Sequence, residues 1–403
     1  MLSRVFVTRE VDDLKRAAAE LTADINDELL QCRDLCGILF CFSDMDHEEL
    51  LRLVRARFPY EIIGCTCIAN MDGAEGFHEM AASFTVLAAN DCAFGIAASG
   101  PVTPENVTDE VGRTFAAARA KLPEEGGDPG LVIALPPYNL SIMLDAFTAA
   151  FNEAAPGVPF IGGLPSHNGK GDRNLTLSRD GASEDRLVML LIQGNVKPVF
   201  SLQNVSGNPV ERKRKVTRSK DNVVYTVGSQ TFVEYLKEVG VGVDRMLDGN
   251  ATISFVSNPL LLENVSIGGQ SSYSFVRTLH KIDPVDGSGT AIGEIPMDAT
   301  LSICSLQAGQ ITEGAERGVS DLLRKMEEAA PYAFSTVLAV SCIGRYLLMV
   351  PNNSAEVDTF LHKIPSGISL NGFYSYGEIA PIAGGNGRLL NFAHNESLVL
   401  CAF

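Results

Sequence analysis

The sequence predicts a mixed α/β protein built from two sheet-containing halves, and three features support this prediction. Short apolar runs typical of buried strands alternate with amphipathic helical segments along the chain. Glycine, proline and asparagine separate these segments. A chain of 403 residues, 46% of them hydrophobic, is too long for one ordinary core. We therefore expect two domains, at 1–200 and 201–403, whose sheets face one another in a layered α-β-β-α arrangement.

In the first half, helices and strands differ in the spacing of their apolar residues. Helical spacing between Val11 and Leu29 predicts the first helix, with Thr8 as its cap. The run at 130–136 is continuously apolar, which is typical of a strand covered on both faces. The same criteria predict strands at 37–42, 60–65, 81–89, 92–98, 158–163, 175–178 and 186–193, and helices from Thr103 onward and at 140–151.

The second half begins near 196–210 and contains three predicted helices. In the segment 312–328, Ala315, Val319 and Leu322 share one helical face. Further helices are expected at 229–239 and at 354–363, where Pro365 prevents continuation. The last segments, 389–392 and 398–403, have the composition of strands.

Charge and cysteine content limit the class of protein. The formal net charge of −17 repels phosphate backbones and anionic lipid surfaces, so nucleic acid and membranes are not expected partners. The longest apolar run, at 187–192, is far shorter than the roughly 20 residues that span a bilayer. The N-terminus lacks the apolar core of a signal peptide, and nine scattered cysteines are typical of free thiols in a reducing compartment. We expect a soluble, cytoplasmic protein.

The sequence contains few motifs of known chemistry. It has no phosphate-binding loop, no nucleophile elbow and no zinc-type cysteine or histidine spacing, so no metal site and no enzyme activity are expected. A thiol nucleophile remains an alternative at Cys65, at a strand end beside a turn, or at Cys342, three residues before Arg345. The other interpretation of both cysteines is that they are small residues packed at strand ends.

Five short segments resemble the FIST family of intracellular sensory domains. They are residues 62–67 (IIGCTC), 160–164 (FIGGL), 341–345 (SCIGR), 372–381 (GFYSYGEIAP) and 394–398 (HNESL). The last three follow in the order and spacing of the family's C-terminal half. The resemblance covers the chain from about residue 36 to the end, with one departure. After the first segment the family continues with a glycine and a glutamate, which this chain lacks.

The resemblance implies a bacterial signal-transduction sensor with a FIST N-like domain at 1–200 and a FIST C-like, ligand-binding domain at 201–403. It implies a small-molecule ligand, amino-acid-like in many members. It also implies a separate output protein, which is a histidine kinase, a diguanylate cyclase or a chemoreceptor.

The segments that carry the resemblance contain polar side chains suited to a zwitterion. Arg345 is able to hold a carboxylate, while Glu378 and a tyrosine hydroxyl are able to bind an ammonium group. The alternative is a buried ion pair between Arg345 and Glu378 with a structural role. The full set of expected ligand-binding residues is Arg345, Glu378, Tyr374, Tyr376, His394, Asn395, Cys342, Gly377, Gly64, Cys65, Gly162 and Gly163.

Haem is the alternative cofactor, because some FIST relatives are described as haem proteins that detect nitric oxide. No haem motif occurs in the sequence. If haem is bound, the expected axial ligands are His394 and then His78. Otherwise no cofactor is expected.

Overall fold

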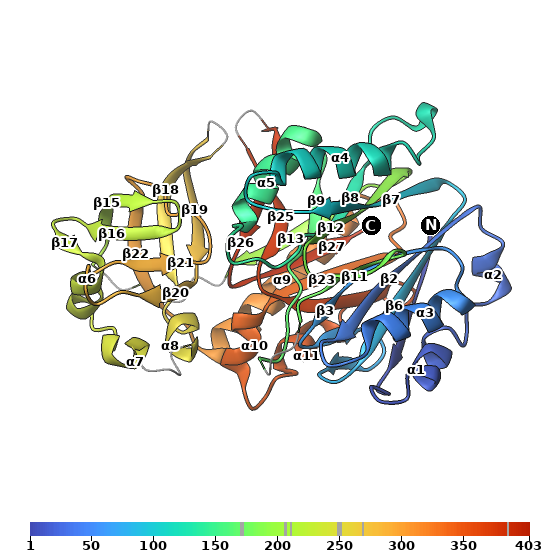
Figure 1. Cartoon of the computed structure of the whole chain (residues 1–403), viewed down its shortest axis with the longest axis horizontal. Helices are drawn as coiled ribbons and strands as arrows, with labels where there is room; N and C mark the ends of the chain where they lie inside the picture. Colours follow the sequence, from blue (N-terminus) through green and yellow to red (C-terminus); the bar gives the residue numbers. More distant parts are fainter. Residues whose placement is uncertain (170–172, 205–207, 210–211, 248–251, 268–269, 385–386) are drawn as a thin grey trace.

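The computed structural model describes residues 1–403 except 170–172, 205–207, 210–211, 248–251, 268–269 and 385–386. The chain forms a large body and a smaller β-rich lobe, which Figure 1 shows on the left in yellow. The fold is mixed α/β, as the sequence predicts.

Three six-stranded sheets form the body. The first sheet has the order β1 (Leu2–Thr8), β6 (Ala82–Ala89), β2 (Asp34–Phe42), β3 (Glu61–Cys67), β10 (Thr176–Ser178) and β11 (Gly181–Ser183). The second has the order β26 (Leu389–His394), β25 (Glu378–Ala383), β9 (Phe160–Gly163), β8 (Leu131–Leu135), β12 (Arg186–Gly194) and β7 (Cys92–Pro101). The third has the order β13 (Val199–Asn204), β27 (Ser397–Ala402), β23 (Thr336–Cys342), β24 (Ser369–Ser375), β4 (Asn70–Asp72) and β5 (Gly76–His78).

Each of these sheets contains one parallel strand pair, and helices connect its two strands. The pair β2 and β3 is joined through α3 (His47–Arg57), and the pair β8 and β9 through α5 (Leu144–Ala154). The pair β23 and β24 is joined through α10 (Ile343–Met349) and α11 (Ala355–Leu361). Parallel strands require such a crossover, and the helix then covers one face of the sheet.

The sheets and helices stack as four layers. One apolar core lies between the second sheet and the faces of the first and third sheets, and includes Phe40, Ile133, Leu190 and Val340. The outer face of the second sheet packs against α4 (Val107–Arg119) and α5. The outer faces of the other two sheets pack against α1 (Leu14–Leu21), α3, α9 (Ala308–Glu328) and α11. The layering is therefore α-β-β-α, as expected.

The sheets join strands from both sides of residue 200. Strand β4 pairs with β24, with Met71 opposite Gly372, and β25 pairs with β9, with Glu378 opposite Gly163. The division into domains at 1–200 and 201–403 stays a prediction. The pairing shows that the two halves of the chain share hydrogen-bonded sheets.

The lobe is a fourth, twisted sheet with short helices on one side. Its order is β19 (Gln270–Arg277), β18 (Leu260–Ile267), β22 (Thr300–Ser305), β15 (Arg214–Lys220), β16 (Val223–Val227), β21 (Gly289–Ala291) and β20 (Leu279–Ile282). Two short strands lie off this order: β14 (Asn208–Pro209) pairs with β22, and β17 (Gln230–Thr231) pairs with β16. Its core contains Tyr235, Leu262 and Leu301 and packs against α6 (Phe232–Glu238), α7 (Val243–Leu247) and α8 (Thr252–Val256).

The helix predicted between Val11 and Leu29 is divided in two. It forms α1 and then α2 (Asp27–Leu30), because the Asn26 side chain accepts a hydrogen bond from Leu29 N at 3.3 Å and starts a new helix. A single turn of 3-10 helix, η1 (Glu124–Gly126), follows α4. Within the described residues, no helix combines the length and apolar character needed to cross a membrane. All nine cysteines are free.

Candidate functional site

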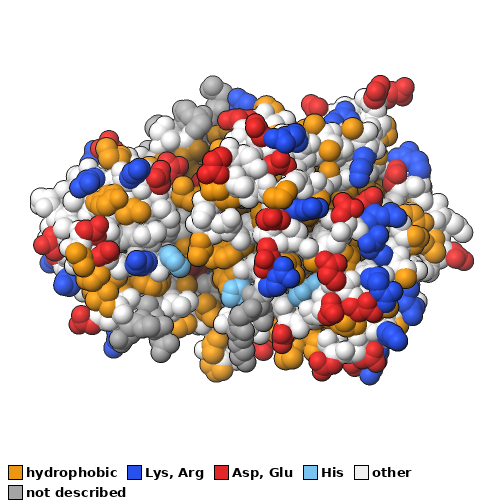
Figure 2. Space-filling view, viewed as in Figure 1, with side chains coloured by type: hydrophobic (Ala, Val, Ile, Leu, Met, Phe, Trp, Pro, Cys, Tyr) orange, Lys and Arg blue, Asp and Glu red, His pale blue; other side chains and the backbone are white. Residues whose placement is uncertain are grey.

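Two adjoining cavities lie where the lobe meets the body. Their volumes are about 510 Å3 and about 250 Å3, and the larger is within the range of about 300 to 1,000 Å3 typical of small-molecule sites. Both are lined by Tyr138, His280, Ile292, Tyr376 and Asn395. We call the two together the junction cavity. Hydrophobic side chains gather along the boundary between the lobe and the body in Figure 2.

Three separate parts of the chain form the walls. Tyr138 follows strand β8, Tyr376 is in the turn between β24 and β25, and Asn395 is in the turn between β26 and β27. His280 in β20 and Ile292 after β21 come from the lobe. The turns that follow β8, β24 and β26 are thus brought to one place only by the shared sheets.

The turn between β26 and β27 supplies two buried side chains with unused hydrogen-bonding capacity. Asn395 is 5% exposed and Glu396 is 0% exposed. The Oδ1 atom of Asn395 and the Oε2 atom of Glu396 have no hydrogen-bond partner within the described part of the chain. Both residues line the larger cavity. Buried polar atoms normally have partners, so these two oxygens indicate a place for a ligand donor.

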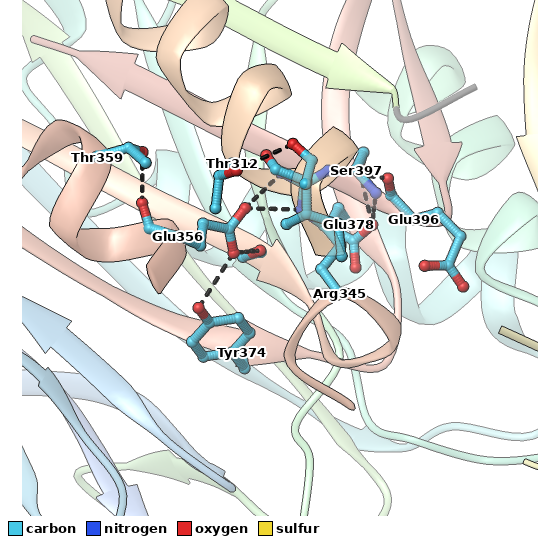
Figure 3. Close-up of polar contacts among 11 residues, drawn as sticks. Thr312, Arg345, Glu356, Thr359, Tyr374, Glu378, Glu396 and Ser397 are labelled. Atoms are coloured by element: carbon cyan, nitrogen blue, oxygen red, sulfur yellow. Dashed lines mark hydrogen bonds and ion pairs between the residues drawn. The ribbon is translucent and has the colours of Figure 1, made fainter. Parts of the chain in front are cut away.

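The position of the Glu396 carboxylate depends on two neighbours in the cavity wall. Thr278 Oγ1 donates to Glu396 Oε1 at 2.8 Å. A Cβ at Gly344 would lie 2.5 Å from either carboxylate oxygen, so a larger residue there would force the Glu396 side chain to move. Figure 3 shows the carboxylate pointing away from Arg345. Burial raises the pKa of Glu396 to about 7, although the hydrogen bond from Thr278 and the charge of Arg345 lower it.

Arg345 is fully buried and forms its ion pair with Glu356 on α11. Its Nε donates to Glu356 Oε1 at 2.7 Å, and its Nη2 contacts the same oxygen. Ser341 Oγ at 2.7 Å and Tyr374 Oη at 3.1 Å donate to the other carboxylate oxygen. Figure 3 shows this network beside α9. Arg345 therefore forms a buried ion pair, as in the alternative interpretation of this residue, but its acid is Glu356 in place of Glu378.

Glu378 is directed toward Ser397 at the start of β27. Its Oε2 accepts from Ser397 N at 3.3 Å and from Ser397 Oγ at 2.8 Å. Burial raises the pKa of Glu378 well above its ordinary value, and the charge of Glu396 adds to this effect. Burial thus disfavours the carboxylate form of Glu378, which is the form that attracts an ammonium ion.

A buried ion pair connects the lobe to the body beside the smaller cavity. Arg277, at the end of β19, is 1% exposed and donates to Asp145 Oδ1 at 2.7 Å and to Ala393 O at 3.0 Å. Its guanidinium lies 4.4 Å from the centroid of the Phe275 ring. Within the described chain Asp145 Oδ2 is buried without a partner. Both charged residues line the smaller cavity.

Two family models match consecutive parts of the chain. The FIST N domain matches residues 36–230 and the FIST C domain matches residues 232–381. The chain belongs to the FIST family. FIST domains are generally sensory domains for small ligands in signal transduction, and the family is not a catalytic one.

Two curated relatives align with almost the whole of this FIST chain. Two uncharacterized proteins of Mycobacterium tuberculosis, from strains CDC 1551 / Oshkosh and ATCC 25618 / H37Rv, are each 26% identical to this chain over 389 residues. The match covers 93% of this chain and 94% of theirs. Phosphoribosylformylglycinamidine synthase II from Thermotoga maritima aligns with 99% of this chain and 71% of its own at 8% identity. Its TM-score of 0.19 is too low to support an argument.

Four of the ligand-binding residues that we expected from the FIST resemblance are at the junction cavity. Cys342, Tyr376, Gly377 and Asn395 each line one or both of its parts. The remaining expected residues are outside the described lining of both parts: Arg345, Glu378, Tyr374, His394, Gly64, Cys65, Gly162 and Gly163. Their roles as ligand-binding residues stay predictions.

Three of the expected glycines permit close packing between strands. A Cβ would lie 1.9 Å from Leu39 O at Gly64 and 1.8 Å from Ala134 O at Gly162. At Gly163 it would lie 2.4 Å from Ser375 Oγ. In the first two cases the carbonyl belongs to the neighbouring parallel strand, so a larger residue at Gly64 or Gly162 would push the paired strands apart.

The two histidines expected to ligate haem in this FIST chain each contact the protein through Nε2, and the Nδ1 atom of each is buried without a partner among the described residues. His394 Nε2 lies 3.3 Å from Ala380 O, and burial lowers the pKa of His394 to about 3. His78 Nε2 contacts the buried carboxylate of Asp72 in the hairpin of β4 and β5. Both imidazoles are outside the described lining of the junction cavity. The roles of His394 and His78 as haem ligands stay predictions.

The thiol alternative also lacks support from electrostatics. Burial raises the pKa of Cys65 well above its ordinary value. Burial, together with the nearby Glu378 and Glu396, raises the pKa of Cys342 in the same way. A thiol must ionise to act as a nucleophile, and both environments disfavour the thiolate. Among the described residues, no group of His, Cys, Asp or Glu is arranged to hold a metal ion.

Sequence reasoning missed Glu396, Tyr138 and the lobe residues of the cavity. Glu396 is adjacent to Asn395 in the segment 394–398, so its position in that segment was the available signal. Thr278, His280 and Ile292 carry no recognisable motif. Only the docking of the lobe against the body brings them to the site.

Proposed function

We propose that this FIST protein is a small-molecule sensor and that its ligand binds in the junction cavity. The observation that supports this proposal most directly is the pair of buried acceptors, Asn395 Oδ1 and Glu396 Oε2, which line the larger cavity and have no donor among the described residues. A ligand of amino-acid size fits a volume of about 510 Å3.

The position of the cavity suggests how binding changes the protein. Its walls come from both the lobe and the body, so a bound molecule contacts both parts at once. Such a ligand favours the arrangement of the lobe in which both sets of contacts form. We propose that a separate histidine kinase, diguanylate cyclase or chemoreceptor responds to this arrangement of the lobe.

Blocking the cavity tests the site. Ile292 lines both parts of the cavity and is 37% exposed, so Ile292→Trp adds volume there without forcing a large side chain into a closed core. Val285 lies in the same lobe and is 94% exposed, which makes Val285→Trp the matched control. Calorimetric titration uses the twenty amino acids together with 2-phenylethylamine and hexylamine as probes.

We expect at least one probe to bind to the wild-type protein and to the Val285→Trp protein with similar affinity. Its affinity for the Ile292→Trp protein should be at least about tenfold lower, because the added indole occupies the ligand's volume. If no probe binds, or if Ile292→Trp leaves binding unchanged, the proposed site is wrong.

A further inference from the structure

We infer that the junction cavity recognises its ligand through a protonated amine, which donates hydrogen bonds to Glu396 and Asn395, and that a ligand carboxylate is not required. This inference rests on the proposed function and specifies the ligand's chemistry at the same site.

The first support is the imbalance between acceptors and donors in the walls. Glu396 Oε2, Asn395 Oδ1 and Asp145 Oδ2 are buried acceptors, each without a partner within the described residues. All three residues line the junction cavity. A group that donates several hydrogen bonds satisfies such acceptors, and an ammonium group has three N–H donors.

The second support is the lack of a cation free to hold a carboxylate. Arg277 is the single arginine or lysine among the described residues that line the cavity. Its guanidinium already donates to Asp145 Oδ1 and to the carbonyls of Ala393, Val276 and Glu294. Arg345 is held by Glu356 and lies outside the described lining. Within the described lining, a ligand carboxylate would therefore approach Glu396 and Asp145 without an arginine or lysine that is free to compensate its charge.

The third support is a group of aromatic rings in the cavity wall, which we call the aromatic wall. The rings of Tyr138 and Tyr376 lie 4.8 Å apart between centroids, and those of His167 and Tyr376 lie 5.5 Å apart. Burial raises the pKa of Tyr376 to about 12, so its phenol is neutral. Neutral aromatic faces attract cations and also cover apolar groups. The wall thus suits an amine with an aromatic or alkyl body.

The carboxylate that we assign to the amine is held in place before the ligand arrives. Thr278 donates to one of its oxygens, and the absence of a side chain at Gly344 lets it pack directly on the backbone of α10. The other oxygen remains available. A charge-assisted hydrogen bond to a fixed acceptor retains more of its strength than one to a mobile acceptor.

Two matched series of ligands test the inference by calorimetric titration of the full chain at pH 8. One series is 2-phenylethylamine, 2-phenylethanol and phenylacetate, and the other is hexylamine, hexanol and hexanoate. Members of a series differ in charge but hardly in shape. Phenylalanine is included as a zwitterion that contains the first amine. We expect each amine to bind about ten- to a hundredfold more tightly than its alcohol and carboxylate partners.

The variant Glu396→Gln removes the negative charge and keeps the size of the side chain. It should lower amine affinity by about ten- to a hundredfold and leave alcohol affinity unchanged. The control is Glu110→Gln on α4, where another buried carboxylate accepts from Gly100 N at 2.9 Å outside the described cavity lining. Amine affinity should not change in the control protein.

The outcomes separate this inference from the proposed function. If a carboxylate or phenylalanine binds more tightly than the matched amine, or if Glu396→Gln binds amines as the wild type does, the amine inference is wrong. The proposed site still stands in that case, provided that Ile292→Trp abolishes binding. If none of the probes binds, both proposals are wrong.

Discussion

The carboxyl group of Glu396 should destabilise the fold at alkaline pH, and the variant Glu396→Gln measures by how much. Burial raises the pKa of this group from an ordinary 4.5 to about 7. Between these two values the folded chain binds a proton that the unfolded chain has released. The free energy of unfolding must therefore decrease as the pH rises through this interval.

The size of the effect follows from the shift in pKa. A shift of about 2.5 units corresponds to about 3 kcal/mol when the group is ionised in both states, which applies at pH 8. At pH 5 the same relation leaves less than about 1 kcal/mol. Glutamine keeps the shape of the side chain and its acceptor for Thr278 but does not ionise. The variant should thus be more stable than the wild type by about 3 kcal/mol at pH 8, and nearly equal to it at pH 5.

Arg345, Glu378 and Cys342 are the charged or titratable neighbours of Glu396 in this part of the body. They remain in place in the variant, so the difference between the two proteins reports mainly on Glu396. Urea denaturation monitored by far-ultraviolet circular dichroism gives the free energies of unfolding at pH 5, 6, 7 and 8. The chain contains no tryptophan, which makes intrinsic tryptophan fluorescence unsuitable.

Asp72→Asn provides a control with the opposite sign. Burial opposes ionisation of Asp72, but hydrogen bonds from His78 and from the N–H groups of Ala74 and Glu75 lower its pKa overall. Ionised Asp72 therefore stabilises the fold above its ordinary pKa of 3.8, and its replacement should destabilise the protein at pH 8. If Glu396→Gln destabilises the protein at pH 8, or if its effect is the same at pH 5 and pH 8, the assignment of a raised pKa is wrong.

Three further predictions concern the affinity of the site, the buried ion pair and the packed glycines. Amine binding to the wild-type protein should weaken as the pH falls from 8 to 6, since Glu396 gains a proton near pH 7, and titrations of the Glu396→Gln protein should show a smaller dependence. Arg345→Ala should cost about 3–5 kcal/mol in a denaturation experiment, because it leaves Glu356 buried without a counter-charge, and an unchanged stability would contradict the structural role. Gly64→Ala should destabilise the protein by about 3 kcal/mol, because its Cβ would meet Leu39 O at 1.9 Å. Gly112→Ala on α4, where an added Cβ would meet nothing within 4 Å beyond the adjoining helix backbone, should instead stabilise the protein by about 0.5–1 kcal/mol, and a larger loss at position 112 than at 64 would refute the argument.

Local spacing of apolar residues determined most of the individual elements. The segment predicted as a strand at 37–42 is the C-terminal two thirds of β2, and the run at 130–136 contains β8. The helix predicted at 312–328 is α9, which begins four residues earlier at Ala308. The helix at 229–239 contains α6, whose start is defined by the capping box of Thr231 and Glu234. These elements follow from interactions between near neighbours in the chain, which the sequence displays directly.

The composition of the site depended on the tertiary structure. Glu356 follows Arg345 by eleven positions, and only the packing of α10 and α11 against β23 and β24 decides that it is the partner. Likewise, Asn395, Tyr138 and Ile292 meet because β26 joins the second sheet and the lobe docks against its end. Strand pairing between distant segments has no local periodicity in the sequence. The sequence alone therefore determined the family, the fold class and many of the elements, whereas the shared sheets and the docked lobe decided which side chains form the cavity.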